Sequence, residues 1–261
     1  MSIKFSKANS KIVKLTKVPE LQKWLEGKRK VYSLDLLSGH NCPFANECLS
    51  KAVERADGSR HIQDGPNTQF RCFSASQEAQ YPNVYNPRKA NSDTLRNLCD
   101  NYDEYTVAQH INDAMPKDLG ICRIHVAGDF FRQKYFNAWI IVAKANPDKL
   151  FYAYTKSLVY WLRMRDEIPS NLVLTASRGG TRDDLIIPHG LREAVVVFSE
   201  KEADDKFLGI DEDDSHAAVP EWRDQSFGLL IHGTQPKGSE AAEALKVIKA
   251  EKRKAKLEAA K

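Results

Sequence analysis

Short apolar runs alternate with segments of helical periodicity along most of the chain, and this alternation constrains the fold more than any other feature. Six runs have the length and the β-branched and aromatic content of buried strands: residues 31–37, 121–128, 150–156, 171–177, 193–199 and 227–233. Segments 133–146 and 157–168 between them have the spacing of helices. Such alternation forms βαβ units with a parallel sheet. The sequence therefore predicts an α/β fold, as a complete or partial barrel or an open doubly wound sheet.

Two segments interrupt the alternation. Residues 38–120, which we call the insertion, separate the first two predicted strands, contain many turn-forming residues and include no predicted strand. Long connections of this kind are often functional. Residues 240–261 predict a charged helix with a solvated face and a frayed end. We expect one domain over residues 1–261, with the insertion and this helix as its additions.

Composition narrows the class of protein. Hydrophobic residues make up 42% and charged residues 28% of the 261 residues, as in soluble globular proteins. The net charge of +4 is modest, so it does not favour a protein that wraps nucleic acid. No apolar stretch approaches the ~20 residues that span a bilayer, and the N-terminus lacks the apolar region of a signal peptide. We therefore expect a cytoplasmic protein, in which disulfides are rare.

Polar side chains occur at the carboxyl ends of five predicted strands. In parallel α/β folds these ends meet at the edge that carries the functional site. A polar strand end has a simple structural explanation for any one residue. His125 taken alone is better explained as a buried core histidine, but its companions Gly128 and Asp129 favour function. Five strands together favour a site. Its candidate lining residues are His125, Asp129, Lys156, Arg178, Glu200 and His232.

Three cysteines lie in the insertion, shortly after the first predicted strand. Five residues separate Cys42 from Cys48, and 23 more separate Cys48 from Cys72. Since this loop follows the carboxyl end of a strand, the thiols belong to the same edge as the polar side chains. Thiolates favour zinc and iron–sulfur clusters, although zinc fingers usually have two closely spaced ligand pairs. A zinc site completed by His40 or His61, and three unligated cysteines, remain open alternatives.

The other two cysteines are poor candidates for a fourth ligand. Cys99 fits the apolar stripe of a helix, and Cys122 begins the second predicted strand, at the opposite end from the loop. Three cysteine ligands would leave one iron of a cubane cluster open to a substrate, a cofactor or another side chain.

The motifs GHNCP…CLS, FRCFSAS, RIHVAGDFF, FYAYTKS, DDSHA and LLIHGTQP together resemble the phage gene product eighty-eight domain family, over roughly residues 30–240. More distantly, six strands with three cysteines after the first are similar to the radical S-adenosylmethionine superfamily. This resemblance implies a partial (β/α)6 TIM-like barrel. It also implies that Cys42, Cys48 and Cys72 hold a [4Fe–4S] cluster, with S-adenosylmethionine as a second cofactor.

Two departures from the superfamily pattern bear on the second cofactor. The usual cysteine spacing is Cys-x₃-Cys-x₂-Cys, whereas here the gaps are five and 23 residues. The glycine-rich element that receives the methionyl amino group is replaced by AGDF, residues 127–130, which leaves Gly128 as the candidate for that role. The cluster is therefore a firmer expectation than S-adenosylmethionine.

The leading hypothesis is a phage-type iron–sulfur protein with a cluster at the mouth of the barrel. As a redox or radical enzyme, it would use the six polar residues to orient a small-molecule or macromolecular substrate. The alternative is a zinc- or iron-stabilised binding protein without catalysis, acting on a host protein or nucleic acid.

The sequence leaves two further possibilities open, a hydrolase and a role for an acidic motif. A metal-dependent hydrolase would use His125, Asp129 and His232, if these side chains meet. Separately, the carboxylates and His216 of the acidic motif DDSHA, residues 213–217, are candidates for a metal site or a lid, but an acidic surface loop with a helix N-cap is the favoured interpretation.

Overall fold

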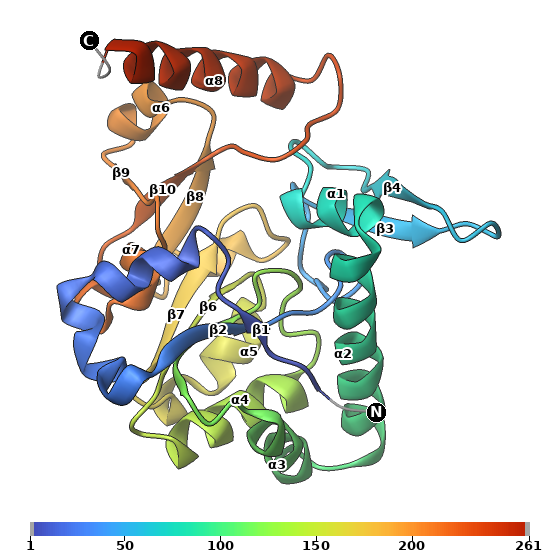
Figure 1. Cartoon of the computed structure of the whole chain (residues 1–261), viewed down its shortest axis with the longest axis vertical. Coiled ribbons are helices and arrows are strands. Elements are labelled where there is room, and N and C mark those ends of the chain that lie inside the picture. Colours follow the sequence, from blue (N-terminus) through green and yellow to red (C-terminus); the bar gives the residue numbers. More distant parts are fainter. Residues whose placement is uncertain (1–2, 259–261) are drawn as a thin grey trace.

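The computed structural model describes residues 3–258, which form a mixed α/β fold around an eight-stranded, mostly parallel sheet (Figure 1). Its six parallel central strands are β2 (Lys30–Leu34), β5 (Leu119–Ile124), β6 (Leu150–Thr155), β7 (Leu172–Ser177), β8 (Glu193–Val197) and β10 (Phe227–Leu230). Each lies within a predicted apolar run, or begins within two residues of it, so the strand predictions are confirmed. The two edge strands are β1 (Ser6–Lys7), antiparallel to β2, and β9 (Gly209–Ile210), parallel to β10.

The sheet is open and its central strands follow chain order. The full order is β1-β2-β5-β6-β7-β8-β10-β9, without the reversal that defines a doubly wound sheet. Within residues 3–258 no strand pairing joins β1 to β9, so the sheet does not close on itself. The complete barrel and the doubly wound sheet are therefore both wrong as predictions.

Helices connect the parallel strands. They are α4 (Gln133–Ala145), α5 (Leu158–Arg163), α6 (Glu200–Asp205) and α7 (Ser215–Ala218), with the 3₁₀ turns η4 (Arg165–Glu167), η5 (Asp183–Leu185) and η6 (Pro220–Trp222). The predicted helix 133–146 is confirmed as α4, whose stripe of Phe136, Trp139 and Ile140 is buried. The predicted helix 157–168 is divided at Met164, where the backbone leaves the helical conformation.

Alternate residues of the strands face two different sets of helices. Phe151 and Ala153 belong to the core beneath α2 (Pro82–Asn101), α3 (Glu104–Ala114) and α4. Leu150 and Tyr152 belong to the core on the other face, which η1 (Ile12–Lys17), η2 (Pro19–Trp24) and α7 cover. The turn η3 (Glu26–Lys28) follows η2 and has no buried residue. The carboxyl ends of the strands stay open on that face, where a cavity of about 650 Å³ lies.

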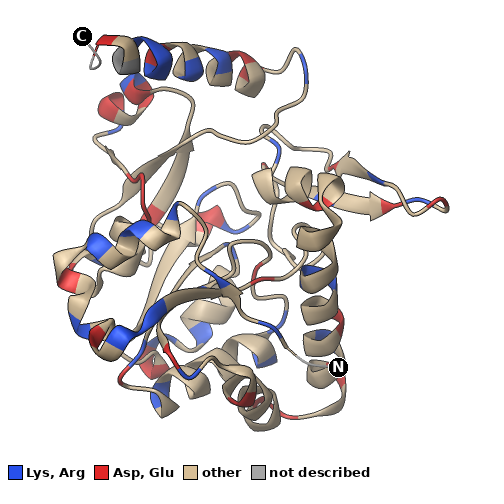
Figure 2. Cartoon of the chain, in the orientation of Figure 1, with Lys and Arg blue, Asp and Glu red and all other residues tan. Residues whose placement is uncertain are grey.

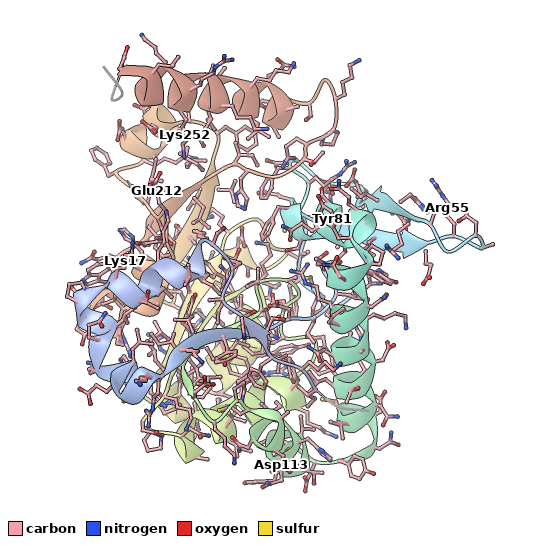
Figure 3. All side chains as sticks on the ribbon, in the orientation of Figure 1. Lys17, Arg55, Tyr81, Asp113, Glu212 and Lys252 are labelled. Atoms are coloured by element: carbon pink, nitrogen blue, oxygen red, sulfur yellow. The ribbon has the colours of Figure 1, made fainter. Side chains whose placement is uncertain are left out.

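The insertion contains a β-hairpin as well as helices. Strands β3 (Ser50–Glu54) and β4 (Arg60–Asp64) pair antiparallel, and α1 (Phe73–Gln80) follows before α2 and α3. The expectation that this segment has no strand is wrong because the hairpin is polar, so it lacks the apolar run of a buried strand. Its turn uses Gly58 at φ 78°, and the hairpin projects from the body, with Arg55 toward its far end (Figures 1 and 3).

The C-terminal segment forms the charged helix α8 (Glu240–Glu258), as predicted (Figure 2). Its apolar residues Ala241 and Ile248 pack with Ile231, and Lys252 pairs with Glu212 at 3.5 Å (Figure 3). The predicted fraying concerns residues 259–261, which lie outside the described residues. None of the described helices has the length and apolar composition needed to cross a membrane.

Candidate functional site

The three cysteines of the insertion lie near one another. Cys48 and Cys72 line a cavity of about 650 Å³ at the carboxyl edge of the sheet. Burial raises the pKa of the Cys42 thiol well above its usual range, and Asp129, Cys72 and Cys48 raise it further. Burial and the charge of Cys48 raise the pKa of Cys72 to about 11. Each influence acts over a short distance, so the three thiols share one electrostatic environment.

These thiols do not form a ready-made metal site. Within the described part of the chain, no three His, Cys, Asp or Glu side chains are placed so that they could hold a metal ion. The finding applies equally to His125, Asp129 and His232, so the structure gives the hydrolase hypothesis no metal centre. The raised pKa values of Cys42 and Cys72 keep both thiols protonated near neutral pH, and metal binding would have to release these protons.

Backbone hydrogen bonds join the chain segments that carry Cys48 and Cys72. The carbonyl of Glu47 accepts from the amides of Gln69 at 2.8 Å and Phe70 at 3.2 Å. The amide of Glu47 in turn donates to the carbonyl of Gly179, beyond β7, at 3.0 Å. The residue before Cys48 is therefore fixed both to the approach to Cys72 and to the sheet.

A buried glutamine clamps the peptide just before Cys72. The Oε1 atom of Gln235 accepts from the Arg71 amide at 2.7 Å, and its Nε2 donates to the Arg71 carbonyl at 3.1 Å. Gln235 is 8% exposed and comes from the loop after β10, 164 residues along the chain. In the same loop, a Cβ on Gly233 would lie 2.7 Å from the Cβ of Phe73, so this loop fits closely against the start of α1.

Glu78 on α1 holds the loop that leads to Cys42. Its carboxylate accepts from the Ser38 amide at 3.1 Å and the Ser38 hydroxyl at 2.7 Å, and it pairs with Arg88 at 3.0 Å. Glu78 is fully buried, and burial raises the pKa of its carboxyl. The Gly39 amide donates to Cys42 Sγ at 3.3 Å. Because Cys72 immediately precedes α1, Glu78 connects the Cys42 loop to the Cys72 helix.

A charged network lies on the sheet side of the cavity. Asp214 pairs with Arg123 and with Lys11, the latter at 2.8 Å, and accepts from the Tyr152 hydroxyl at 3.0 Å. The guanidinium of Arg123 lies 4.8 Å from the ring centre of Tyr154. Burial opposes ionisation of Asp214, but the two cations outweigh it and hold the pKa of Asp214 below its usual value.

This network corrects the prediction for DDSHA. Asp213 accepts from the Ser215 amide at 3.0 Å, but the N-cap residue of α7 is Asp214, whose side chain makes no capping hydrogen bond. Asp214, however, is fully buried, because its backbone at φ 67° turns the side chain toward Arg123. Sequence reasoning did not select Arg123 or Asp214 as site residues. A basic residue inside an apolar strand, together with the acidic motif, was the available signal.

Lys156 lines the same cavity as Cys48, Cys72, Arg123 and Asp214. It is 7% exposed, and its Nζ donates to Ser177 Oγ at 2.6 Å and to the carbonyls of Ser177 and Arg178 at 3.1 and 2.9 Å. Asp129 accepts from the Lys156 amide at 2.8 Å and the Thr155 hydroxyl at 2.6 Å. Burial raises the pKa of Asp129 to about 6.

The other predicted residues separate into two groups. His232 lines the cavity with its ring centre 4.8 Å from that of Phe73, and partial burial lowers its pKa. His125 lies in the core instead, where its Nε2 is 3.0 Å from the Tyr135 hydroxyl. Arg178 pairs with Glu193. Glu200 is exposed at the start of α6. His125, Arg178 and Glu200 are not part of the cavity lining.

Gly128 has a packing explanation. Its φ is 88°, and a Cβ there would lie 2.6 Å from the Cβ of Leu36, so the loop after β5 can approach the loop after β2 only with glycine.

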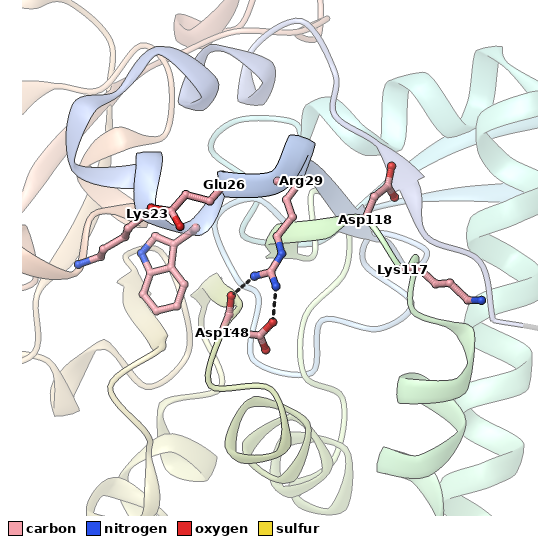
Figure 4. A pocket seen from close by; sticks show the side chains of 8 residues that line it. Lys23, Glu26, Arg29, Lys117, Asp118 and Asp148 are labelled. Carbon is pink, nitrogen blue, oxygen red and sulfur yellow. Dashed lines mark hydrogen bonds and ion pairs between the residues drawn. The ribbon is translucent and has the colours of Figure 1, made fainter.

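A second hollow of about 990 Å³ occupies the opposite edge of the sheet, at the amino ends of the strands (Figure 4). Arg29 there donates to the carbonyl and the carboxylate of Asp148, each at 2.6 Å, and Lys117 and Asp118 lie nearby. No cysteine lines this hollow. The cysteine-lined cavity is therefore the better candidate site.

These features define an open, chain-ordered α/β protein with a cysteine-lined cavity at the carboxyl edge of its sheet. The chain belongs to the gene product 88 family, whose model matches residues 3–254. This match confirms the closer of the two resemblances and supports the bacteriophage association, but it gives no support to the radical S-adenosylmethionine superfamily. Comparisons with curated proteins and with solved structures found no match.

Proposed function

We propose that the protein is an iron–sulfur protein in which Cys42, Cys48 and Cys72 ligate a [4Fe–4S] cluster on a partial barrel. The observation that carries this proposal is the shared electrostatic environment of the three thiols, which come from loops fastened to one another. Because the side chains are not in ligand geometry, binding requires them to turn toward a common centre. The proposal does not include S-adenosylmethionine, since packing on Leu36 accounts for Gly128.

The residues around the thiols can respond to a change in the charge of the site, such as deprotonation of Cys42. Asp129 raises the pKa of Cys42, so protonation of Asp129 favours the Cys42 thiolate. Lys156 keeps a fixed donor on the cavity wall through its contacts with Ser177. When bound, the cluster would supply electron transfer or an iron open to substrate. His232 and Lys156 would then orient a substrate in the cavity.

The test is the metal content of protein purified without oxygen. We expect a brown protein with about four irons and four sulfides per chain. Cys42→Ala should lose most of the iron. Cys99→Ala, which replaces a cysteine on the buried face of α2 and serves as the matched control, should keep it. One zinc and no iron would reject the cluster and favour the metal-stabilised, non-catalytic alternative. Full iron retention in Cys42→Ala would reject the assignment of the ligands.

A further inference from the structure

Basic side chains dominate the charged lining of the cysteine-lined cavity. Asp35 and Asp214 are its acidic residues. Its basic residues are Lys7, Lys11, Arg71, Arg88, Arg123 and Lys156. The cavity is therefore a place where negative charge is favoured, unless neighbouring carboxylates compensate all these cations.

Neighbouring carboxylates compensate only part of this charge. Arg71 pairs with Asp64, and Arg88 pairs with Glu78. Lys11 and Arg123 share a single partner, Asp214.

Two further lysines lack such a partner. Across residues 3–258, neither Lys7 nor Lys156 has a carboxylate oxygen within 4.0 Å of its ammonium group. Asp35 accepts from the Val126 amide at 2.7 Å and from the Ser33 hydroxyl at 3.0 Å, and it forms no ion pair within the described part of the chain. The balance stays positive even when Asp35 and Asp129 are counted against these groups.

Lys156 is the cation that most needs a counter-charge. It is nearly buried, and all three of its acceptors are neutral oxygens. A buried charge is expensive unless an opposite charge compensates it. The site beside it is open to the cavity, so an anionic ligand can supply that compensation.

The remaining residues of the cavity lining are suited to contact the apolar part of a ligand. Phe73, Tyr154, Val196 and Leu229 face the same space, and His232 lies against Phe73. The volume of about 650 Å³ falls within the range of small-molecule sites, about 300–1,000 Å³. The lining therefore combines cations at the sheet and aromatic or aliphatic side chains around them.

We propose that the cavity binds a small molecule carrying an oxyanion, a phosphate or a carboxylate, on an aromatic or apolar body. Lys11, Arg123 and Lys156 bind the oxyanion, and Phe73 with its neighbours contacts the body. This inference deepens the proposed function, on which it rests, by naming the substrate class of the same cavity.

Two matched pairs of probes test the inference by calorimetry: AMP with adenosine, and benzoate with benzamide. The anionic member of at least one pair should bind at least tenfold more tightly than its neutral partner. The pair that shows this preference distinguishes phosphate from carboxylate recognition. Equal affinity within both pairs would overturn the inference.

Variants locate the binding. Lys156→Gln should reduce the affinity for the preferred anion about tenfold, and so should Lys11→Gln, whose side chain is 35% exposed and whose loss leaves Arg123 as the charged partner of Asp214. Lys23→Gln, at the opposite hollow (Figure 4), is the matched control and should bind like the parent protein. Parent-like affinity in both folded cavity variants would contradict the inference.

Iron content measured on the same samples separates the two proposals. Iron-loaded protein without a preference for anions would reject the oxyanion site and leave the cluster intact. An anion preference in protein that binds no iron would reject the cluster and uphold the anion-binding cavity.

Discussion

The side chain of Gln235 hydrogen-bonds to the peptide of Arg71, the residue before Cys72, in the way that the backbone of a neighbouring strand would. Its amide oxygen accepts from the Arg71 amide, and its Nε2 donates both to the Arg71 carbonyl and, at 2.9 Å, to the carbonyl of His232 in its own loop. Each such bond contributes about 1 kcal/mol net, and a buried peptide left without partners costs more. Gln235 is thus a positioning residue for Cys72, although it contacts neither the thiol nor the cavity.

Replacing Gln235 by Ala should free the segment before Cys72. Because both hydrogen bonds to the Arg71 peptide are lost, we expect the alkylation rate of Cys72 by iodoacetamide, followed by peptide mass spectrometry, to rise about tenfold. Gln235→Glu keeps the acceptor but loses the donor, so its rate should fall between. Gln225→Ala, at an exposed position, is the control. An unchanged Cys72 rate in Gln235→Ala would show that the clamp does not hold this segment.

His125 combines an unusual backbone with an unusual ionisation. Its φ is 70°, it is 3% exposed, and burial together with the charge of Arg123 lowers its pKa from 6.5 to about 3. The folded state therefore favours the neutral imidazole. Its contribution to stability is complete above pH 6.5 and is lost progressively as the pH falls from 6.5 toward 3.

The stability of the protein should record this titration. Between pH 7.5 and pH 5, His125 alone should lower the free energy of unfolding by about 2 kcal/mol. His125→Asn, in which asparagine tolerates the positive φ, should show a correspondingly shallower pH dependence in urea denaturation. His189→Asn, at an exposed turn, should keep the slope of the parent protein. Equal slopes for His125→Asn and the parent would refute the buried neutral histidine.

At the scale of elements, helix α8 is attached through a narrow apolar stripe. Ala241 and Ile248 contact the cluster that contains Ile231, and Phe70 and Phe198 pack against the same cluster. Phe70 lies two residues before Cys72, so α8 covers part of the framework behind the site. The rest of the helix carries charge toward solvent (Figure 2).

A charge in the stripe should detach the helix, whereas a charge beside it should not. Ile248 is 7% exposed and Val247 is 56% exposed. Ile248→Glu buries an unpaired carboxylate and should accelerate trypsin cleavage within α8 at least tenfold, since the helix must open to avoid that cost. Val247→Glu should be cleaved at the parent rate. Similar cleavage of both variants would mean that the stripe does not anchor the helix.

At the scale of the whole molecule, the sequence predicted those strands and helices whose positions follow from the periodicity of apolar residues. The six central strands and α4 follow from local apolar patterns, which burial on both faces of a parallel sheet enforces. Whether the sheet closes depends on curvature summed over eight strands, and no local pattern records it. The polar hairpin β3–β4 was missed because its strands are not buried and therefore lack an apolar run.

The sequence likewise predicted only part of the candidate site. Lys156, His232, Cys48 and Cys72 reach one cavity, because they follow the carboxyl ends of strands β6, β10 and β2 in one parallel sheet. Glu200 does not, because the chain turns into α6 at its capping Ser199 and carries the side chain to the surface. Position along a strand can be estimated from a sequence, whereas the direction of the loop that follows depends on tertiary contacts.

The clamp on Arg71 also has a consequence for biosynthesis. The three cysteines leave the ribosome early, but Gln235 emerges more than 160 residues after the peptide it holds. Until then the Cys72 segment lacks its partner from the loop after β10. A nascent chain therefore displays its thiols well before it can fix them, and a product truncated before residue 235 keeps the cysteines without the completed framework. Assembly of the site is thus tied to synthesis of the chain at least as far as Gln235.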